Sequence, residues 1–255
     1  MDTLRSCFTS AIEQRRALEA VGDFFQAVEL NLYDASVCAF DPSSSGQEAF
    51  RCFMNIYNEL SGPNWSVWRS RNPAPHWGPQ QIFDTIKREF AEYPWDGTAN
   101  LTSFGRAEAA RLKPRLESMR GIKPNKGYPI MTVSKFLHFY NPALFPIYDT
   151  EVIWKKVCDG YFKSDFRDFC RDLCDREGPR YTVFMNEDTV DFLPAYMRWA
   201  ASLFSVAHSG FMQVFVDWLG DQLGANLLRR KFDAKTLHAR AFEYTAVGAA
   251  IAGGC

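Results

Sequence analysis

The sequence of 255 residues predicts an all-α fold of about ten helices. Apolar residues recur every three or four positions in most segments, which is the spacing of one helix face. Residues 181–184 (Tyr-Thr-Val-Phe) read as a local β run, but four residues do not make a sheet. Aromatic side chains make up 15% of the chain, so we expect a core built from aromatic residues on helices.

Residues 4–60 are expected to form the first helices. Leu4, Phe8 and Ile12 begin an apolar stripe at helical spacing that continues to residue 40, with Gly22 as its weak point. Residues 41–46 (Asp-Pro-Ser-Ser-Ser-Gly) are types that favour turns, so they end this run. Residues 47–60 again carry apolar side chains at helical spacing and predict a second amphipathic helix.

Residues 61–79 differ in kind, because they form a long connection rich in proline and indole. Trp65, Trp68 and Trp77 lie in it, together with Arg69. Loops of this length tend to be functional or disordered, and so much indole argues against disorder. We expect an aromatic loop that lines a pocket, although each indole has burial in the core as its alternative.

The rest of the chain continues the helical pattern. Pro79 suits the first turn of a helix that runs to residue 93, and Pro114 is expected to divide the helical run of residues 104–120. Further helices are expected at residues 132–140, 165–176, 193–205, 211–223 and 234–251. We predict one globular unit over residues 1–255 with two lobes, one formed by residues 1–100 with 190–255 and a helix-turn-helix lobe formed by residues 101–189.

The composition narrows the class of protein. An odd number of cysteines, no signal-like N-terminus and no apolar run near 20 residues favour a cytoplasmic, reducing location. Cys170 and Cys174 are one helical turn apart, which is more typical of core packing than of metal binding, and the four histidines are widely spaced. We therefore expect no metal or cofactor. Phosphate-binding loops, dinucleotide fingerprints, serine-hydrolase elbows and zinc-protease motifs are also missing.

The net charge is −1, but the cations are unevenly distributed. We call the basic residues between positions 106 and 135 the cationic strip; they are Arg106, Arg111, Lys113, Arg115, Arg120, Lys123, Lys126 and Lys135. Only Glu108 and Glu117 oppose them in this stretch. A local basic face on a neutral protein indicates phosphate binding, and the alternative is a solvated helix face.

The segment with most chemical promise is residues 141–149 (Asn-Pro-Ala-Leu-Phe-Pro-Ile-Tyr-Asp), an apolar turn between two helix-like runs. It places Asp149 at the mouth of the second helix. The positive end of a helix keeps a carboxylate charged, and an apolar setting strengthens the field of that charge. Asp149 is thus a candidate catalytic carboxylate, and the alternative is a simple N-cap.

The order of a Gly-bounded turn (residues 121–127), a helix, the run Pro146-Ile147-Tyr148-Asp149 and a second helix resembles the core of the helix-hairpin-helix DNA glycosylase superfamily. This resemblance implies a two-lobed helical enzyme that flips a modified or damaged base out of double-stranded DNA. It assigns the catalytic role to Asp149. The turn departs from the family pattern, because Pro124 removes a backbone donor, so Arg120, Lys123 and Lys126 are expected to contact DNA phosphates instead.

The resemblance also guides the other site residues. Lys135 is the second catalytic candidate, but it does not stand at the family spacing for a Schiff-base lysine, so we expect a monofunctional enzyme that uses water. Tyr140 and Tyr148 join the three tryptophans as stacking candidates. His138 shares a helix face with Lys135 and could approach a phosphate or the leaving base, with a structural role as its alternative.

Among such enzymes, phage-defence glycosylases that remove glucosylated hydroxymethylcytosine are the relatives to test first. Two other classes stay open. A non-catalytic α-helical DNA-binding or regulatory protein would use the same cationic strip, and a helical module with a tryptophan-lined pocket would bind a small molecule or a protein.

Overall fold

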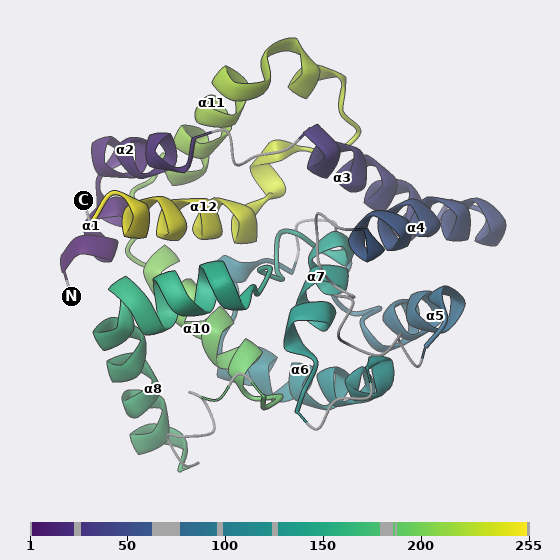
Figure 1. The fold of residues 1–255 in the computed structure, drawn as a ribbon, viewed down its shortest axis with the longest axis horizontal. Coiled ribbons are helices and arrows are strands. Elements are labelled where there is room, and N and C mark those ends of the chain that lie inside the picture. Colours follow the sequence, from purple (N-terminus) through teal and green to yellow (C-terminus); the bar gives the residue numbers. More distant parts are fainter. Residues whose placement is uncertain are drawn as a thin grey trace.

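The computed structural model describes residues 2–22, 27–62, 77–95, 99–123, 127–178, 186 and 188–253. Over these residues the secondary structure is helical, without a strand, which confirms the all-α prediction. The long helices of Figure 1 are α1 (Asp2–Thr9), α2 (Ala11–Val21), α3 (Ala27–Phe40), α4 (Gly46–Ser61), α5 (Pro79–Glu89), α6 (Arg106–Ser118), α7 (Ile130–Tyr140), α8 (Lys163–Glu177), α10 (Phe192–Phe204), α11 (Phe211–Leu223) and α12 (His238–Ile251). Shorter segments are η1 (Leu101–Ser103), η2 (Arg120–Ile122), the π-helix η3 (Thr150–Tyr161), η4 (Gly224–Arg229) and η5 (Ala234–Thr236).

The N-terminal helical run is divided where its sequence is weakest. Ser10 separates α1 from α2, because its hydroxyl accepts a hydrogen bond from the Glu13 N–H and caps the second helix. Gly22 then ends α2 with φ of +62°, a conformation that only glycine adopts readily. The predicted weak point is confirmed. The predicted turn after α3 is also present, since Asp41 accepts hydrogen bonds from the N–H and hydroxyl groups of Ser43.

Two proline predictions have different outcomes. Pro79 occupies the first turn of α5, as predicted. Pro114 lies inside α6 but does not divide it, since the helix runs from Arg106 to Ser118. The helix α5 ends at Glu89, earlier than predicted, and the Phe90 carbonyl at its end accepts a hydrogen bond of 2.7 Å from the Tyr140 hydroxyl. A tertiary hydrogen bond therefore satisfies the carbonyl group at the end of α5.

Helix α12 lies below α2 in the left half of the view (Figure 1). It packs along α2 and also contacts α1, α11 and η3, and its residues 239–249 are buried. Gly248 allows the close approach to α2, because a side chain there would overlap the backbone oxygen of Ala17. The pair α3 and α4 lies at the opposite side, and both chain ends lie near α1 (Figure 1).

The predicted aromatic core is confirmed. The rings of Phe8 and Phe211 stack at 4.7 Å and join α1 to α11. On the other side of the molecule, Phe40 meets Tyr140 edge to face at 4.9 Å and links α3 to α7. These contacts span segments that are far apart in the sequence, so the core holds the whole arrangement together. Helix α10 contacts α1, α6 and α8, and thus joins the two predicted lobes, whose division stays a prediction.

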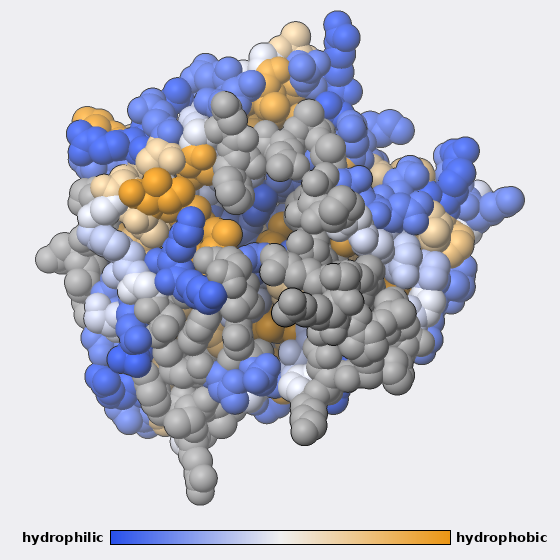
Figure 2. All heavy atoms as spheres, in the orientation of Figure 1, coloured by the Kyte–Doolittle hydropathy of each residue, from blue (hydrophilic) through white to orange (hydrophobic). Residues whose placement is uncertain are grey.

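The part of the surface that Figure 2 colours by hydropathy is mainly hydrophilic, with apolar colour gathered where α12 lies in Figure 1. Ile12 is the most exposed of the large apolar side chains that the structure describes, at 72%. None of the described helices combines the length and the hydrophobicity that a membrane crossing requires.

The cysteines only partly follow expectation. Cys38 on α3 and Cys52 on α4 form a disulfide, and Cys7 is also disulfide-bonded. Cys170 is a free, buried thiol near Cys174, as the core-packing interpretation predicted. Burial raises the pKa of Cys170 to about 12, so this thiol stays protonated.

Candidate active site

Helix α7 and the turn that follows it form a buried platform. Side chains on every face of α7 between Thr132 and Tyr140 are buried, so the helix lies inside the protein and is not amphipathic. Asn141 then fixes the turn. Its amide donates hydrogen bonds of 3.1 Å to the Tyr93 and Ala99 carbonyls, and its side-chain oxygen accepts the Ala143 N–H at 3.0 Å. The platform therefore holds the segment that ends at Asp149 in one conformation.

Asp149 makes two contacts, a cap hydrogen bond and an ion pair. Its Oδ1 accepts the Val152 N–H at 3.2 Å, so it caps η3. Its Oδ2 lies 3.6 Å from Nζ of Lys135, which forms an ion pair. The Lys135 side chain is only 4% exposed, whereas that of Asp149 is 30% exposed. The carboxylate is thus the outward end of a charge pair whose cation is inside the protein.

A second lysine lies beside this pair. Lys123, expected at a DNA phosphate, is 5% exposed. Burial lowers the pKa of Lys123, and the nearby positive charge of Lys135 lowers it further. Two amines and one carboxylate therefore share a largely buried site. Its burial does not favour the expected contact of Lys123 with a DNA phosphate.

Behind the platform lies a buried polar cluster, formed by Glu29, Tyr33, His138, Arg240, Glu243 and Tyr244. Arg240 pairs with Glu29 through Nε at 2.7 Å and donates from Nη1 to Glu243. Two carboxylates thus share one guanidinium. Glu243 Oε1 also accepts the N–H of Ile147, two residues before Asp149. Burial raises the pKa of Glu243 to about 7, even though Arg240 opposes the shift.

His138 belongs to this cluster and has a structural position. Its Nδ1 donates to the Phe145 carbonyl at 2.7 Å, and its Nε2 lies 2.8 Å from the Tyr33 hydroxyl. Burial lowers the pKa of His138 well below its ordinary value, with a further contribution from Arg240, so the ring is neutral. The Tyr33 hydroxyl has one proton for two acceptors, Nε2 of His138 and Oε1 of Glu29. His138 therefore supports the turn and does not face a ligand.

The tyrosines expected to stack on a base are also in the core. Tyr140 is 5% exposed, and Tyr148 is fully buried with its ring edge to face against Phe192 at 5.1 Å. Both rings are covered by protein, which corrects the expectation that they offer stacking surfaces. Trp77 is partly buried and packs against Gly121, where an added side chain would come within 3.0 Å of its indole nitrogen. Trp65, Trp68, Arg69 and Lys126 lie outside the described residues.

Most residues of the cationic strip form ion pairs with acidic residues of the protein. Arg120 pairs with Glu117 through two nitrogens, at 2.7 and 2.9 Å. Arg106, Arg111, Lys113 and Arg115 pair with Glu177, Glu108, Asp191 and Glu92, respectively. An ion pair must be opened before such a cation can bind phosphate. The density of basic residues in the sequence therefore overstates the free positive charge on this surface.

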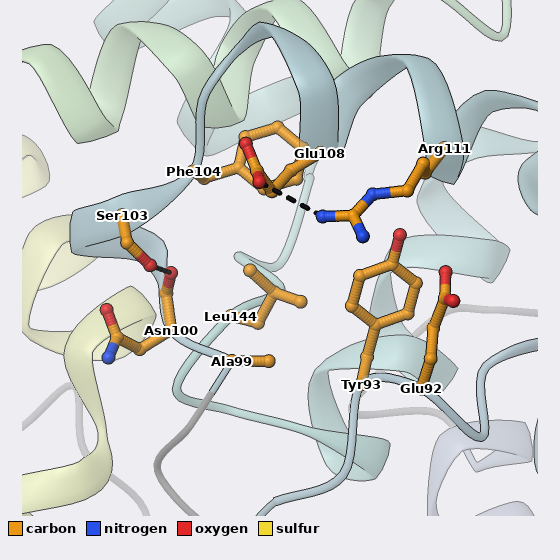
Figure 3. Close-up of a pocket in the computed structure, with 9 residues that line it drawn as sticks. All are labelled: Glu92, Tyr93, Ala99, Asn100, Ser103, Phe104, Glu108, Arg111 and Leu144. Carbon is orange, nitrogen blue, oxygen red and sulfur yellow. Dashed lines mark hydrogen bonds and ion pairs between the residues drawn. The ribbon is translucent and has the colours of Figure 1, made fainter.

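A cavity of about 230 Å³ lies close to the platform, with Leu144 in its wall. Figure 3 shows Tyr93 and Arg111 at one edge of it, Glu108 and Phe104 at another, and Leu144 at its base. The Tyr93 hydroxyl is buried without a hydrogen bond of good geometry. Burial and, secondarily, the neighbouring Glu92 raise the pKa of Tyr93 to about 12. The charged walls are internally paired, so the cavity shows no preference for an ionic ligand.

Among the described residues, no group of three or more histidine, cysteine or acidic side chains could hold a metal ion. The buried cluster of Glu29, Arg240 and Glu243 was not anticipated from the sequence. A signal for it exists, since Arg240, Glu243 and Tyr244 lie three or four residues apart in an otherwise apolar segment. Charged residues at such positions require internal partners.

No protein-family model, no curated protein and no solved structure matches this chain. The resemblance to the helix-hairpin-helix DNA glycosylases therefore rests on the sequence around Asp149 alone.

Proposed function

We propose that this chain is a monofunctional DNA glycosylase, which hydrolyses the N-glycosidic bond of a modified or damaged base flipped out of double-stranded DNA. The observation that carries this proposal is the ion pair of Asp149 with Lys135. It supplies a partly exposed carboxylate, held in place by the Val152 N–H and paired with a buried lysine. A fixed carboxylate of this kind suits a reaction in which positive charge develops on a sugar.

In the proposed reaction, the bond between C1′ and the base nitrogen breaks, and its electron pair leaves with the base. The Asp149 carboxylate stabilises the oxocarbenium-like sugar and orients a water molecule, whose oxygen forms the new bond to C1′. The departing base takes up a proton, and the water loses one. The ion pair with Lys135 holds the Asp149 carboxylate in place during these steps. Water as nucleophile agrees with the monofunctional assignment.

The proposed substrate class includes hypermodified cytosine of phage DNA, which would give the protein a role in antiviral defence. Stacking of the flipped base is assigned to the aromatic loop with Trp65 and Trp68, with Arg69 beside them, since Tyr140 and Tyr148 are enclosed in the core. Trp77, which follows these residues in the sequence, is partly buried and packs against Gly121.

The test is the substitution Asp149→Asn, assayed on a panel of genomic DNAs that includes phage DNA with hypermodified cytosine. Asparagine caps a helix as well as aspartate does, so fold and DNA affinity should persist while abasic-site formation falls by about 10²–10³-fold. Asp233→Asn is the matched control, because Asp233 also accepts a backbone N–H, from Lys235, at the start of a short helix. This variant should keep full activity.

Two results would contradict the proposal. If wild-type protein releases no base from any DNA of the panel yet binds DNA, the chain is a non-catalytic DNA-binding or regulatory protein and Asp149 is only a cap. If sodium borohydride traps a covalent complex between protein and abasic DNA, an amine is the nucleophile and the enzyme is not monofunctional.

A further inference from the structure

A second hollow lies away from Asp149, between η1, α8 and α10, with a volume of about 290 Å³. Its walls combine two chemistries. Arg176 and Arg198 contribute guanidinium groups, and Thr102 and Ser202 contribute hydroxyls. Phe104 and Phe169 provide apolar surface in the same hollow. The site thus offers cationic donors beside a surface suited to a ring or a sugar.

The charges around this hollow do not balance. Glu177 pairs with Arg198 at 2.7 Å and with Arg106 at 3.7 Å, and Arg176 is also close enough to act on it. Hydrogen bonding from Arg198 lowers the pKa of Glu177, and the other arginines add to the effect, so its charge is fixed at neutral pH. One carboxylate therefore faces three guanidinium groups.

Arg176 is the least compensated of the three. Its Nε donates to the backbone carbonyl of Asp172 at 3.0 Å, which orients the side chain. Within the part of the chain that the structure describes, no carboxylate lies at ion-pair distance from it. The contrast with the cavity beside Leu144 is direct, because there Arg111 is paired with Glu108. Of these two cavities, the hollow between η1, α8 and α10 is therefore the one with an arginine that has no carboxylate at ion-pair distance among the described residues.

We propose that this hollow binds the phosphate group of a nucleotide, with Arg176 as its cationic donor and the partly exposed ring of Phe169 against the attached sugar or base. Planar guanidinium groups match the geometry of phosphate oxygens and bind them through paired hydrogen bonds. The volume exceeds what a phosphate alone requires, which is why a complete nucleotide unit is assigned. The phosphate can belong to the DNA backbone or to a free nucleotide.

The test compares three ligands by equilibrium binding: a deoxynucleoside 5′-monophosphate, the same nucleoside without phosphate, and a short unmodified DNA duplex. Arg176→Gln is the test variant, since Arg176 is exposed and its loss does not disturb packing. Arg171→Gln is the matched control. Arg171 is also an exposed arginine of α8, but it is paired with Asp168. We expect the monophosphate to bind at least tenfold more tightly than the nucleoside, and Arg176→Gln to remove most of that difference while Arg171→Gln preserves it.

The duplex identifies the source of the phosphate. If Arg176→Gln weakens duplex binding as well, the hollow contacts the DNA backbone; if only the monophosphate is affected, it binds free nucleotides. Equal affinity for nucleotide and nucleoside, or equal effects of the two variants, would overturn the proposal. None of these measurements needs base release, so they are independent of the role of Asp149.

Discussion

At the scale of single residues, the position of Asp149 depends on side chains buried behind it. Glu243 accepts a hydrogen bond from the Ile147 N–H, and His138 donates one to the Phe145 carbonyl. The buried cluster thus holds the backbone of residues 145–147 at two points. Among the residues that the structure describes, Arg240 is the cation that pairs with both Glu29 and Glu243. Because charges without a partner are costly in a dry interior, the cluster favours holding one extra proton. Glu243 is the carboxylate that accepts it.

This proton predicts a pH dependence of stability. The pKa of Glu243 is raised to about 7 in the folded protein, above its unfolded value, so the folded state binds the proton more tightly. The contribution is therefore fully present below the unfolded pKa and is lost as the pH rises through about 7. We expect the free energy of unfolding to fall from pH 5 to pH 8 by about 1–3 kcal/mol more in wild type than in Glu243→Gln.

Urea denaturation of both proteins at the two pH values measures this difference. Glutamine keeps an acceptor for the Ile147 N–H but does not titrate. The comparison with wild type is necessary because His138 acts in the opposite direction. The pKa of His138 is lowered in the folded protein, so its contribution to stability falls as the pH decreases below the ordinary pKa of histidine. A difference between wild type and Glu243→Gln that is the same at pH 5 and pH 8 would show that Glu243 is ionised throughout.

At the scale of elements, helical spacing predicted where helices form better than where they end. The spacing of apolar residues located α4 and α11 closely, because their buried faces alone determine them. The end of α5 depends on Tyr140, which lies 50 residues away and binds the Phe90 carbonyl. The site shows the same limit. The motif singled out Asp149 as a candidate, but its distance from Lys135 depends on how α7 and the following turn fold, which the sequence does not show.

The crossing of α12 and α2 gives a prediction for the packing of elements. Gly248→Ala should lower the free energy of unfolding by about 1–3 kcal/mol, since the new methyl group would overlap the Ala17 backbone and force the helices apart. Gly220→Ala in α11 is the matched control, because nothing lies within 4 Å of an added Cβ there. Alanine is the better helix former, so this variant should gain up to about 1 kcal/mol.

Chemical denaturation of the two glycine variants checks both signs. A stabilised Gly248→Ala protein would mean that α12 and α2 are further apart in solution than they are here. Equal effects of the two substitutions would indicate that helix propensity decides the outcome and that the close crossing contributes little.

At the scale of the whole molecule, the sequence shows how much charge the protein carries but not how much of it is available. The cationic strip appeared as a basic face because its residues are close in the sequence. Folding brings Glu92, Glu177 and Asp191 from other segments to pair with it. The hollow with Arg176 could not be predicted, since its walls come from η1, α8 and α10 and only the fold unites them.

The salt dependence of DNA binding distinguishes paired from available cations. The logarithm of the binding constant falls with the logarithm of salt concentration by about 0.9 for each phosphate neutralised on duplex DNA. Arg120 must lose Glu117 before it can contact a phosphate, so Arg120→Gln should change this slope by much less than one unit. If the Arg176 hollow contacts the backbone, Arg176→Gln should reduce the slope by about 0.9. Titrations of one duplex at several salt concentrations measure both slopes. A reduction near 0.9 for Arg120→Gln would show that DNA displaces Glu117 and that the cationic strip is the binding face after all.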